Sequence, residues 1–131
     1  MMKPLPYLLL RLLAGMSLFG HGLVRMPKLM EFSNWMTAQF AQSMLPQILV
    51  KPFSYILPFA ELLTGFLLLI GLFTKQAVVA GAIIMMVLIF GSAMLEQWDA
   101  IPSQLIHGAI LVCLLQYIAS NHYSIDYKYN L

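Results

Sequence analysis

Four long apolar stretches constrain this chain more than any other feature. They lie at about residues 5–24, 53–73, 77–95 and 101–120. A helix needs about 20 mostly apolar residues to cross the hydrocarbon core of a bilayer. The stretches lack the alternation of barrel strands, and an open sheet cannot span a membrane. The sequence therefore predicts an all-α integral membrane protein with four transmembrane helices.

The overall composition agrees with this prediction. Of the 131 residues, 61% are hydrophobic and 9% are charged, whereas a soluble domain carries about 25% charged residues. The net charge is only +2, and the lysines and arginines are scattered singly, without the basic run that nucleic-acid binding requires. Cys113 is the single cysteine, so no disulfide can form within the chain. We expect one domain over residues 1–131, with the lipid bilayer as its main partner.

Short connections between the later spans predict their arrangement. Only residues 74–76 separate the second span from the third, and residues 96–100 separate the third from the fourth. Such connections make neighbouring helices antiparallel, and four spans place both termini on one side. The cations are divided equally between the two sides: Lys3, Lys75 and Lys128 against Arg25, Lys28 and Lys51. The positive-inside rule therefore does not set the orientation.

The segment at about residues 27–46 is amphipathic rather than spanning. Its apolar residues recur at helical spacing: Leu29, Phe32, Met36 and Phe40. Polar residues fill the positions between them, which is typical of a helix lying in the membrane interface. Trp35, Arg25 and Lys28 are the residues expected at that interface. The alternative is an ordinary ordered loop.

Two charges inside the spans require an explanation, because a charge in hydrocarbon is costly. Arg11 lies in the first span and Glu61 lies in the second, which runs in the opposite direction, so their depths should agree. Gly15 and Gly22 share the face of Arg11, and Gly65 shares that of Glu61, which allows close approach. We expect Arg11 and Glu61 to interact, directly or through water. The pair would fix helix register or serve ligand or proton chemistry; alternatively, Arg11 extends alone to the interface.

Further polar residues predict a pocket beside Glu61. Pro58 removes a backbone donor one turn before Glu61, which favours a cavity there. His21, His107 and Gln104 fall in the same half of the membrane. Two inward histidines can hydrogen-bond a quinone carbonyl or ligate a haem, and polar packing without a ligand is the remaining alternative.

No metal-binding spacing is present, and the pattern favours a quinone over a haem. No nucleophile elbow or catalytic triad is present either, so no catalytic residue is predicted. The candidate pocket residues are Arg11, Glu61, His21, His107 and Gln104.

Residues 58–77, PFAELLTGFLLLIGLFTKQA, resemble the central signature of the DoxX family. In that signature a glutamate opens the pattern Glu-x-x-x-Gly-x-x-Leu-x-x-Gly-Leu-x-Thr-Arg/Lys. The matching residues are Glu61, Gly65, Leu68, Gly71, Leu72, Thr74 and Lys75. The first span resembles the family's arginine, His-Gly pair and following basic residue. These are Arg11, His21, Gly22, and Arg25 or Lys28.

The resemblance implies a small multi-pass protein of the bacterial inner, or cytoplasmic, membrane with cytoplasmic termini. The family takes its name from a membrane subunit of a thiosulfate:quinone oxidoreductase and is similar to the redox-associated MauE group. The resemblance thus implies an accessory or anchoring subunit of a quinone-linked redox system, acting with a partner protein rather than as a stand-alone enzyme.

The alternative function is small-molecule transport or a role as a permeability factor. Four spans enclose little volume, so a transporter of this size would have to act as an oligomer, and the two halves do not mirror each other as inverted repeats do. The third span offers Ala77-x-x-x-Gly81 as a small-residue face. We expect such a face to suit a homodimer.

Overall fold

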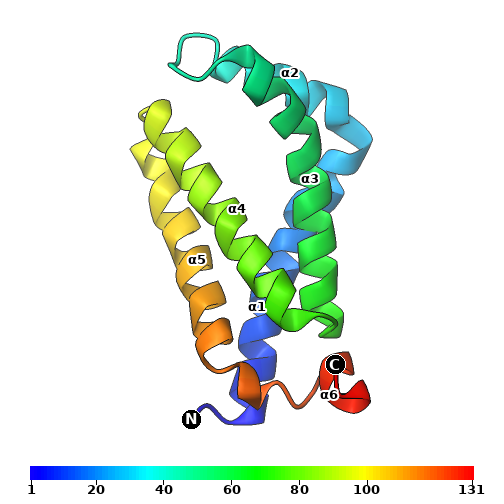
Figure 1. The fold of residues 1–131 in the computed structure, drawn as a ribbon. Helices are drawn as coiled ribbons and strands as arrows, with labels where there is room; N and C mark the ends of the chain where they lie inside the picture. Colours follow the sequence, from blue (N-terminus) through cyan, green and yellow to red (C-terminus); the bar gives the residue numbers. More distant parts are fainter.

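A computed structural model describes all of residues 1–131, and its secondary structure consists of helices joined by turns and loops, with no strand (Figure 1). Four helical stretches are long and apolar enough to cross a membrane, which confirms the predicted four-helix membrane bundle. The elements in chain order are α1 (Pro4–Arg25), η1 (Met26–Lys28), α2 (Leu29–Gln39), α3 (Gln47–Ile70), α4 (Thr74–Met94), η2 (Trp98–Ala100), α5 (Ile101–Gln116), η3 (Ile118–Ser120) and α6 (Ile125–Tyr129).

The helix boundaries differ from the expected ones mainly in α3 and α5. Helix α3 begins at Gln47 rather than near residue 53, directly after Pro46 in extended backbone. It ends at Gly71, whose φ of 71° is the left-handed conformation that closes many helices. Helix α5 ends at Gln116, and a short 3-10 turn replaces the last residues of the expected span.

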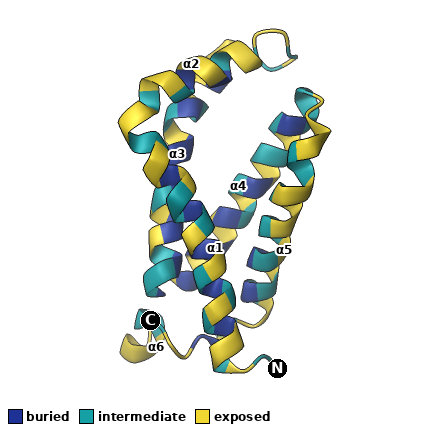
Figure 2. Cartoon of the chain, turned by 180° about the vertical axis from the view of Figure 1, so that it is seen from behind, coloured by how far each residue is buried: buried dark blue, intermediate teal, exposed yellow.

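The long helices form two pairs, α1 with α3 and α4 with α5. The pairs lie close together at the end that carries both chain termini and separate toward the opposite end, where α2 lies beside α3 (Figures 1 and 2). Both termini therefore lie at the same end, as an even number of spans predicts. The outward faces of the helices are largely exposed and apolar, as lipid contact requires.

Glycines bring α1 and α3 into close contact. A Cβ atom added at Gly22 would lie 2.5 Å from the backbone nitrogen of Leu62, and one at Gly65 would overlap the backbone of Phe19. Arg11, Gly22 and Gly65 are buried, so the faces predicted from their spacing are the packed ones. The glycines set the register between the two helices, because no side chain keeps their backbones apart.

The main hydrophobic core lies where the two pairs converge. Tyr7, Leu68, Val78 and Leu114 are completely buried there. The hydroxyl of Tyr7 donates to the carbonyl oxygen of Leu114 at 2.9 Å, which joins α1 to α5 and satisfies a buried polar group.

The small-residue face of α4 packs within the chain. Ala77 is 2% exposed, and a Cβ atom added at Gly81 would lie 3.0 Å from a methyl group of Leu111 in α5. This face therefore packs against α5 within the chain, and a homodimer stays a prediction.

The C-terminal segment folds back over the converging end of the bundle. The carboxylate of Asp126 accepts hydrogen bonds from the backbone N–H groups of Phe73 and Thr74, each at 2.7 Å. These are unpaired donors at the start of α4, so Asp126 caps that helix from a distant part of the sequence. The backbone N–H of Asp126 also donates to the carbonyl oxygen of Gly71 at 3.0 Å.

The amphipathic segment contains the helix that its pattern predicts. Ser33 and Met36 of α2 are buried against α3, while Glu31 and Asn34 are exposed. The hydroxyl of Ser54 donates to that of Ser33 at 2.7 Å, fixing α2 on α3. The position of α2 in a membrane interface stays a prediction.

Candidate ligand-binding cavity

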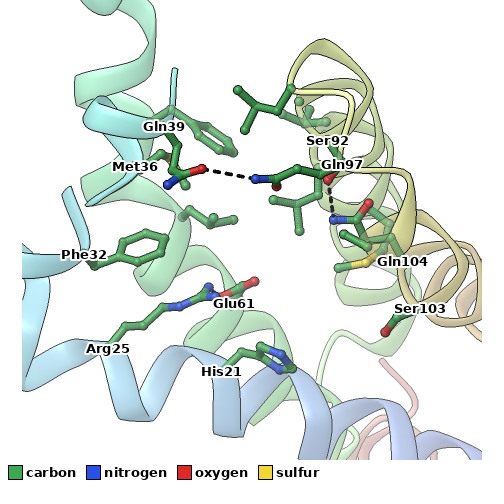
Figure 3. Close-up of a pocket in the computed structure, with 18 of the residues that line it drawn as sticks. His21, Arg25, Phe32, Met36, Gln39, Glu61, Ser92, Gln97, Ser103 and Gln104 are labelled. Carbon is green, nitrogen blue, oxygen red and sulfur yellow. Dashed lines mark hydrogen bonds and ion pairs between the residues drawn. The ribbon is translucent and has the colours of Figure 1, made fainter. Parts of the chain in front are cut away.

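A cavity of about 340 Å³ lies between α1, α2 and α3 on one side and α4 and α5 on the other (Figure 3). Just over half of its lining residues are hydrophobic. Six of the polar or charged lining residues come from four different helices: His21, Arg25, Glu61, Ser92, Gln104 and His107. The cavity lies toward the end where the helix pairs separate, and it lies beside Glu61, where we expected a pocket.

Glu61 forms an ion pair with Arg25 at the edge of this cavity. The Nη1 atom of Arg25 donates to Oε2 of Glu61 at 2.7 Å (Figure 3). The Glu61 side chain is 3% exposed and that of Arg25 is 28% exposed. The guanidinium carbon of Arg25 also lies 4.4 Å from the ring centre of Phe32, a cation–π contact. Arg25, expected in the membrane interface, is thus the charge partner of Glu61.

Arg11 does not interact with Glu61, and that expectation is wrong. Arg11 donates through Nη1 to the side-chain oxygen of Asn121 and through Nη2 to the carbonyl oxygen of Tyr123 at 2.9 Å. Gly22 of α1 lies beside Leu62 of α3, so Arg11 lies about 16 Å farther along the bundle than the Glu61 level. Arg11 is buried but outside the cavity, where it anchors the C-terminal segment.

The two histidines lie together on the cavity wall, with ring centres 6.3 Å apart and ring planes nearly perpendicular. The Nδ1 atom of His21 bonds the carbonyl oxygen of Ser17, and that of His107 bonds the carbonyl oxygen of Ser103, each at 2.7 Å. A carbonyl oxygen only accepts, so both Nδ1 atoms carry the hydrogen. The hydroxyl of Ser17 lies 2.6 Å from Nε2 of His107 and joins α1 to α5.

This arrangement does not fit haem ligation. The Nε2 atom of His107 is already bonded to Ser17, so it is not free to ligate iron. No group of three or more His, Cys, Asp or Glu side chains is placed to hold a metal ion either. Both histidines are hydrogen-bonded within the chain, to Ser17 and Ser103.

Gln104 presents an unsatisfied polar atom. Its Nε2 donates to the hydroxyl of Ser92 at 3.0 Å, whereas its buried Oε1 has no hydrogen-bond partner. Above it, Nε2 of Gln97 donates to Oε1 of Gln39 at 3.1 Å, which connects α2 to the α4–α5 pair across the cavity (Figure 3). A buried acceptor without a partner is rare in native proteins, because no protein hydrogen bond replaces the hydrogen bond to water that it loses on folding.

The structure thus brings together most, but not all, of the predicted residues. Glu61, His21, His107, Gln104, Arg25 and Trp35 line the cavity. Arg11 and Lys28 do not line it. Ser17, Phe32 and Gln97 were missed, and only Phe32 had a signal, since it lies on the apolar face of the 27–46 segment.

The fold and the cavity define a small multi-pass membrane protein with a largely apolar pocket, which carries a few polar groups, inside a four-helix bundle. The DoxX family model matches residues 7–94, which include most of α1 and all of α2 to α4, and the chain belongs to the DoxX family. His21, Arg25 and Glu61 fall within the matched region, whereas Gln104 and His107 follow it. Comparison with curated proteins and with solved structures gave no match.

Proposed function

We propose that the cavity binds the head group of a quinone-class molecule, and that the protein is an accessory or anchoring subunit of a quinone-linked redox system. One observation carries the proposal. The Arg25–Glu61 pair and His21 lie in a mostly apolar cavity of about 340 Å³ between membrane-spanning helices. Ligand sites have volumes of about 300–1,000 Å³, apolar walls and a few polar groups that orient the ligand.

The location of the cavity supports a ligand that reaches it through the bilayer. The helices that line it carry exposed apolar side chains on their outer faces, among them Leu63 and Phe90. We propose that the membrane is the bacterial inner membrane and that both termini are cytoplasmic. The cavity would then open toward the opposite, outer side.

The closed end of the bundle favours binding over transport. Beyond the cavity, Tyr7, Leu68 and Leu114 fill the space between the helix pairs, and the C-terminal segment covers that end. A transport path through one chain would have to cross this packed core. The alternative function would therefore need a path between several chains.

Extraction of lipid-soluble molecules from the purified protein tests the binding proposal. We expect mass spectrometry to identify a quinone in the wild type and a reduced amount in Leu57→Trp, because Leu57 lines the cavity. Leu63→Trp adds the same bulk on the outer face, where Leu63 is 60% exposed, and should retain the quinone. A wild type that contains no quinone and takes up none on titration would overturn the proposal.

Isolation of the intact complex from native membranes tests the accessory role. We expect a redox protein to accompany the chain in mild detergent. Recovery of the chain alone would contradict that role if, in addition, membranes from a strain that lacks the chain retain their quinone-dependent activity.

A further inference from the structure

We propose that Trp35 is the ring-binding residue of the cavity, and that it holds a quinone-class ligand by stacking on the flat face of the ligand ring. The inference rests on the proposed function and adds to it the side chain that recognises the ring. Arg25 and the other polar groups can orient the oxygens of a ligand, but they do not distinguish a flat ring from a puckered one. Recognition of the ring itself depends on an aromatic face that the fold leaves free, since aromatic rings attract one another when stacked with an offset.

Trp35 carries the most exposed of the phenylalanine and tryptophan rings that line the cavity. The three phenylalanines of the lining, Phe32, Phe40 and Phe53, are only partly exposed and pack against the buried cluster around Leu57. Trp35 is 54% exposed and does not belong to that cluster. Its indole therefore has ring surface that a ligand can reach.

Contacts within the chain hold the indole beside the polar groups of the cavity. Trp35 stacks on Phe32 with ring centres 6.0 Å apart and ring planes 25° from parallel. Phe32 in turn contacts the guanidinium of Arg25, which is fixed by Glu61. A ring that stacks on Trp35 thus lies on the same wall as the N–H groups that Arg25 does not use for Glu61, and these can donate to a carbonyl oxygen.

Trp98 provides a comparison within the same chain. It is 61% exposed at the same end of the bundle but lies outside the cavity. Exposed tryptophans at a membrane interface anchor a protein among the lipid head groups, and exposure alone would give both residues that role. Trp35 differs because it lines the cavity and contacts Phe32. The chain has only these two tryptophans, so each can be observed alone when the other is replaced.

The first test compares duroquinone with its saturated analogue, 2,3,5,6-tetramethylcyclohexane-1,4-dione, which keeps both carbonyl groups and loses the flat ring. Binding is measured by calorimetry on the full chain in detergent. We expect Trp35→Leu to weaken duroquinone binding by about three- to tenfold, the effect of one aromatic stacking contact. Binding of the dione should be nearly unchanged, because leucine keeps an apolar contact. Trp35→Phe should retain most of the affinity, and the matched control Trp98→Leu should change neither probe.

Fluorescence gives a readout that a purely structural role of Trp35 would not produce. In Trp98→Phe all tryptophan emission comes from Trp35. We expect bound duroquinone to quench nearly all of it, with the dissociation constant that calorimetry gives. In Trp35→Phe all emission comes from Trp98, and bound duroquinone should quench a much smaller fraction, because Trp98 does not line the cavity.

Different results separate the inference from the proposed function. Duroquinone binding that leaves Trp35 no more quenched than Trp98, or that is unchanged in Trp35→Leu, would overturn the inference and leave quinone binding intact. Equal losses of duroquinone and dione binding in Trp35→Leu would also overturn it, because the contact would then not depend on a flat ring. Failure of the wild type to bind duroquinone would overturn the proposed function and the inference together. If Trp35→Leu does not fold, the fluorescence of Trp98→Phe remains decisive.

Discussion

Arg25, the last residue of α1, donates to Glu61 in α3 across 2.7 Å, while Arg11 on the same helix takes no part. The two arginines are about 21 Å apart along α1. One supports the cavity, and the other holds the C-terminal segment at the opposite end. The distinction between them leads to the first prediction.

Arg25 and Glu61 should be energetically coupled, and Arg11 and Glu61 should not. We expect Arg25→Met and Glu61→Gln each to lower the free energy of unfolding by about 1–3 kcal/mol, because each leaves a polar group without its partner. The double variant should lose less than the sum, by about 1 kcal/mol. Thermal unfolding in one detergent measures all four proteins.

The control cycle pairs Arg11→Met with Glu61→Gln. These effects should add within about 0.5 kcal/mol, since the side chains share no partner. Strong coupling in this cycle, or strict additivity in the first, would contradict the observed pairing.

Gly65 should tolerate no added side-chain atom, whereas Gly20 should. A Cβ atom at Gly65 would overlap the backbone of Phe19, and a Cβ atom at Gly20 would meet no atom within 4 Å. We expect Gly65→Ala to lower the free energy of unfolding by about 1–3 kcal/mol, because the added methyl group forces α1 and α3 apart. Gly20→Ala should be neutral or stabilising by up to about 1 kcal/mol. Equal melting temperatures in the two variants would show that α1 and α3 do not approach each other as closely as the contact of Gly65 with Phe19 requires.

The C-terminal segment should loosen when its contacts with the bundle are removed. Asp126→Ala removes the side chain that caps α4 and should lower the free energy of unfolding by about 1 kcal/mol. Arg11→Met deletes the two bonds to residues 121 and 123. We expect both to speed amide hydrogen exchange in residues 121–131, measured by mass spectrometry. Asp99→Ala, an exposed acid at the other end of the bundle, should leave that exchange unchanged.

His21 and His107 should both carry their hydrogen on Nδ1. Nitrogen-15 NMR of the histidine rings measures this directly, and His122→Gln removes the third histidine from the spectrum. Ser17→Ala removes the hydroxyl that bonds His107 but keeps the carbonyl that bonds His21. We therefore expect this variant to change the signal of His107 Nε2 and leave that of His21. Hydrogen on Nε2 of His21 would remove one acceptor from the cavity.

The helices and their packed faces follow from local pattern. Gly15, Gly22 and Gly65 recur at spacings that place them on inward faces, and the structure buries all three. The four spans follow from length and hydropathy alone. Such features depend on residues that are near one another in sequence, so a pattern with one period describes them.

The axial register of α1 against α3 does not follow from the sequence pattern, and this register determines which residues Arg11 contacts. Equal distances from the estimated helix ends suggested that Arg11 and Glu61 lie at one depth. The observed register is set by the contact of Gly22 with Leu62, which places the end of α1 at the level of Glu61. This register displaces Arg11 from Glu61 by about 16 Å, or about three helical turns, and so decides which charges meet.

The polar contacts between residues far apart in the chain could not be predicted from the sequence either. Nothing in the C-terminal segment indicates that Asp126 caps α4 or that Asn121 bonds Arg11, because these partners are far apart in the chain. Ser17 was missed for a similar reason. Its hydroxyl binds a histidine on another helix, and a lone serine inside an apolar span gives no sign of this.

The dependence of Arg11 on the C-terminal segment has a consequence for biosynthesis. Its partners follow it by 110 and 112 residues, which at about 5–20 residues per second takes a ribosome about 5–20 s. Throughout that interval α1 carries a guanidinium whose final acceptors do not yet exist. Insertion of the first span must therefore leave Arg11 in contact with water or lipid head groups until translation reaches Tyr123.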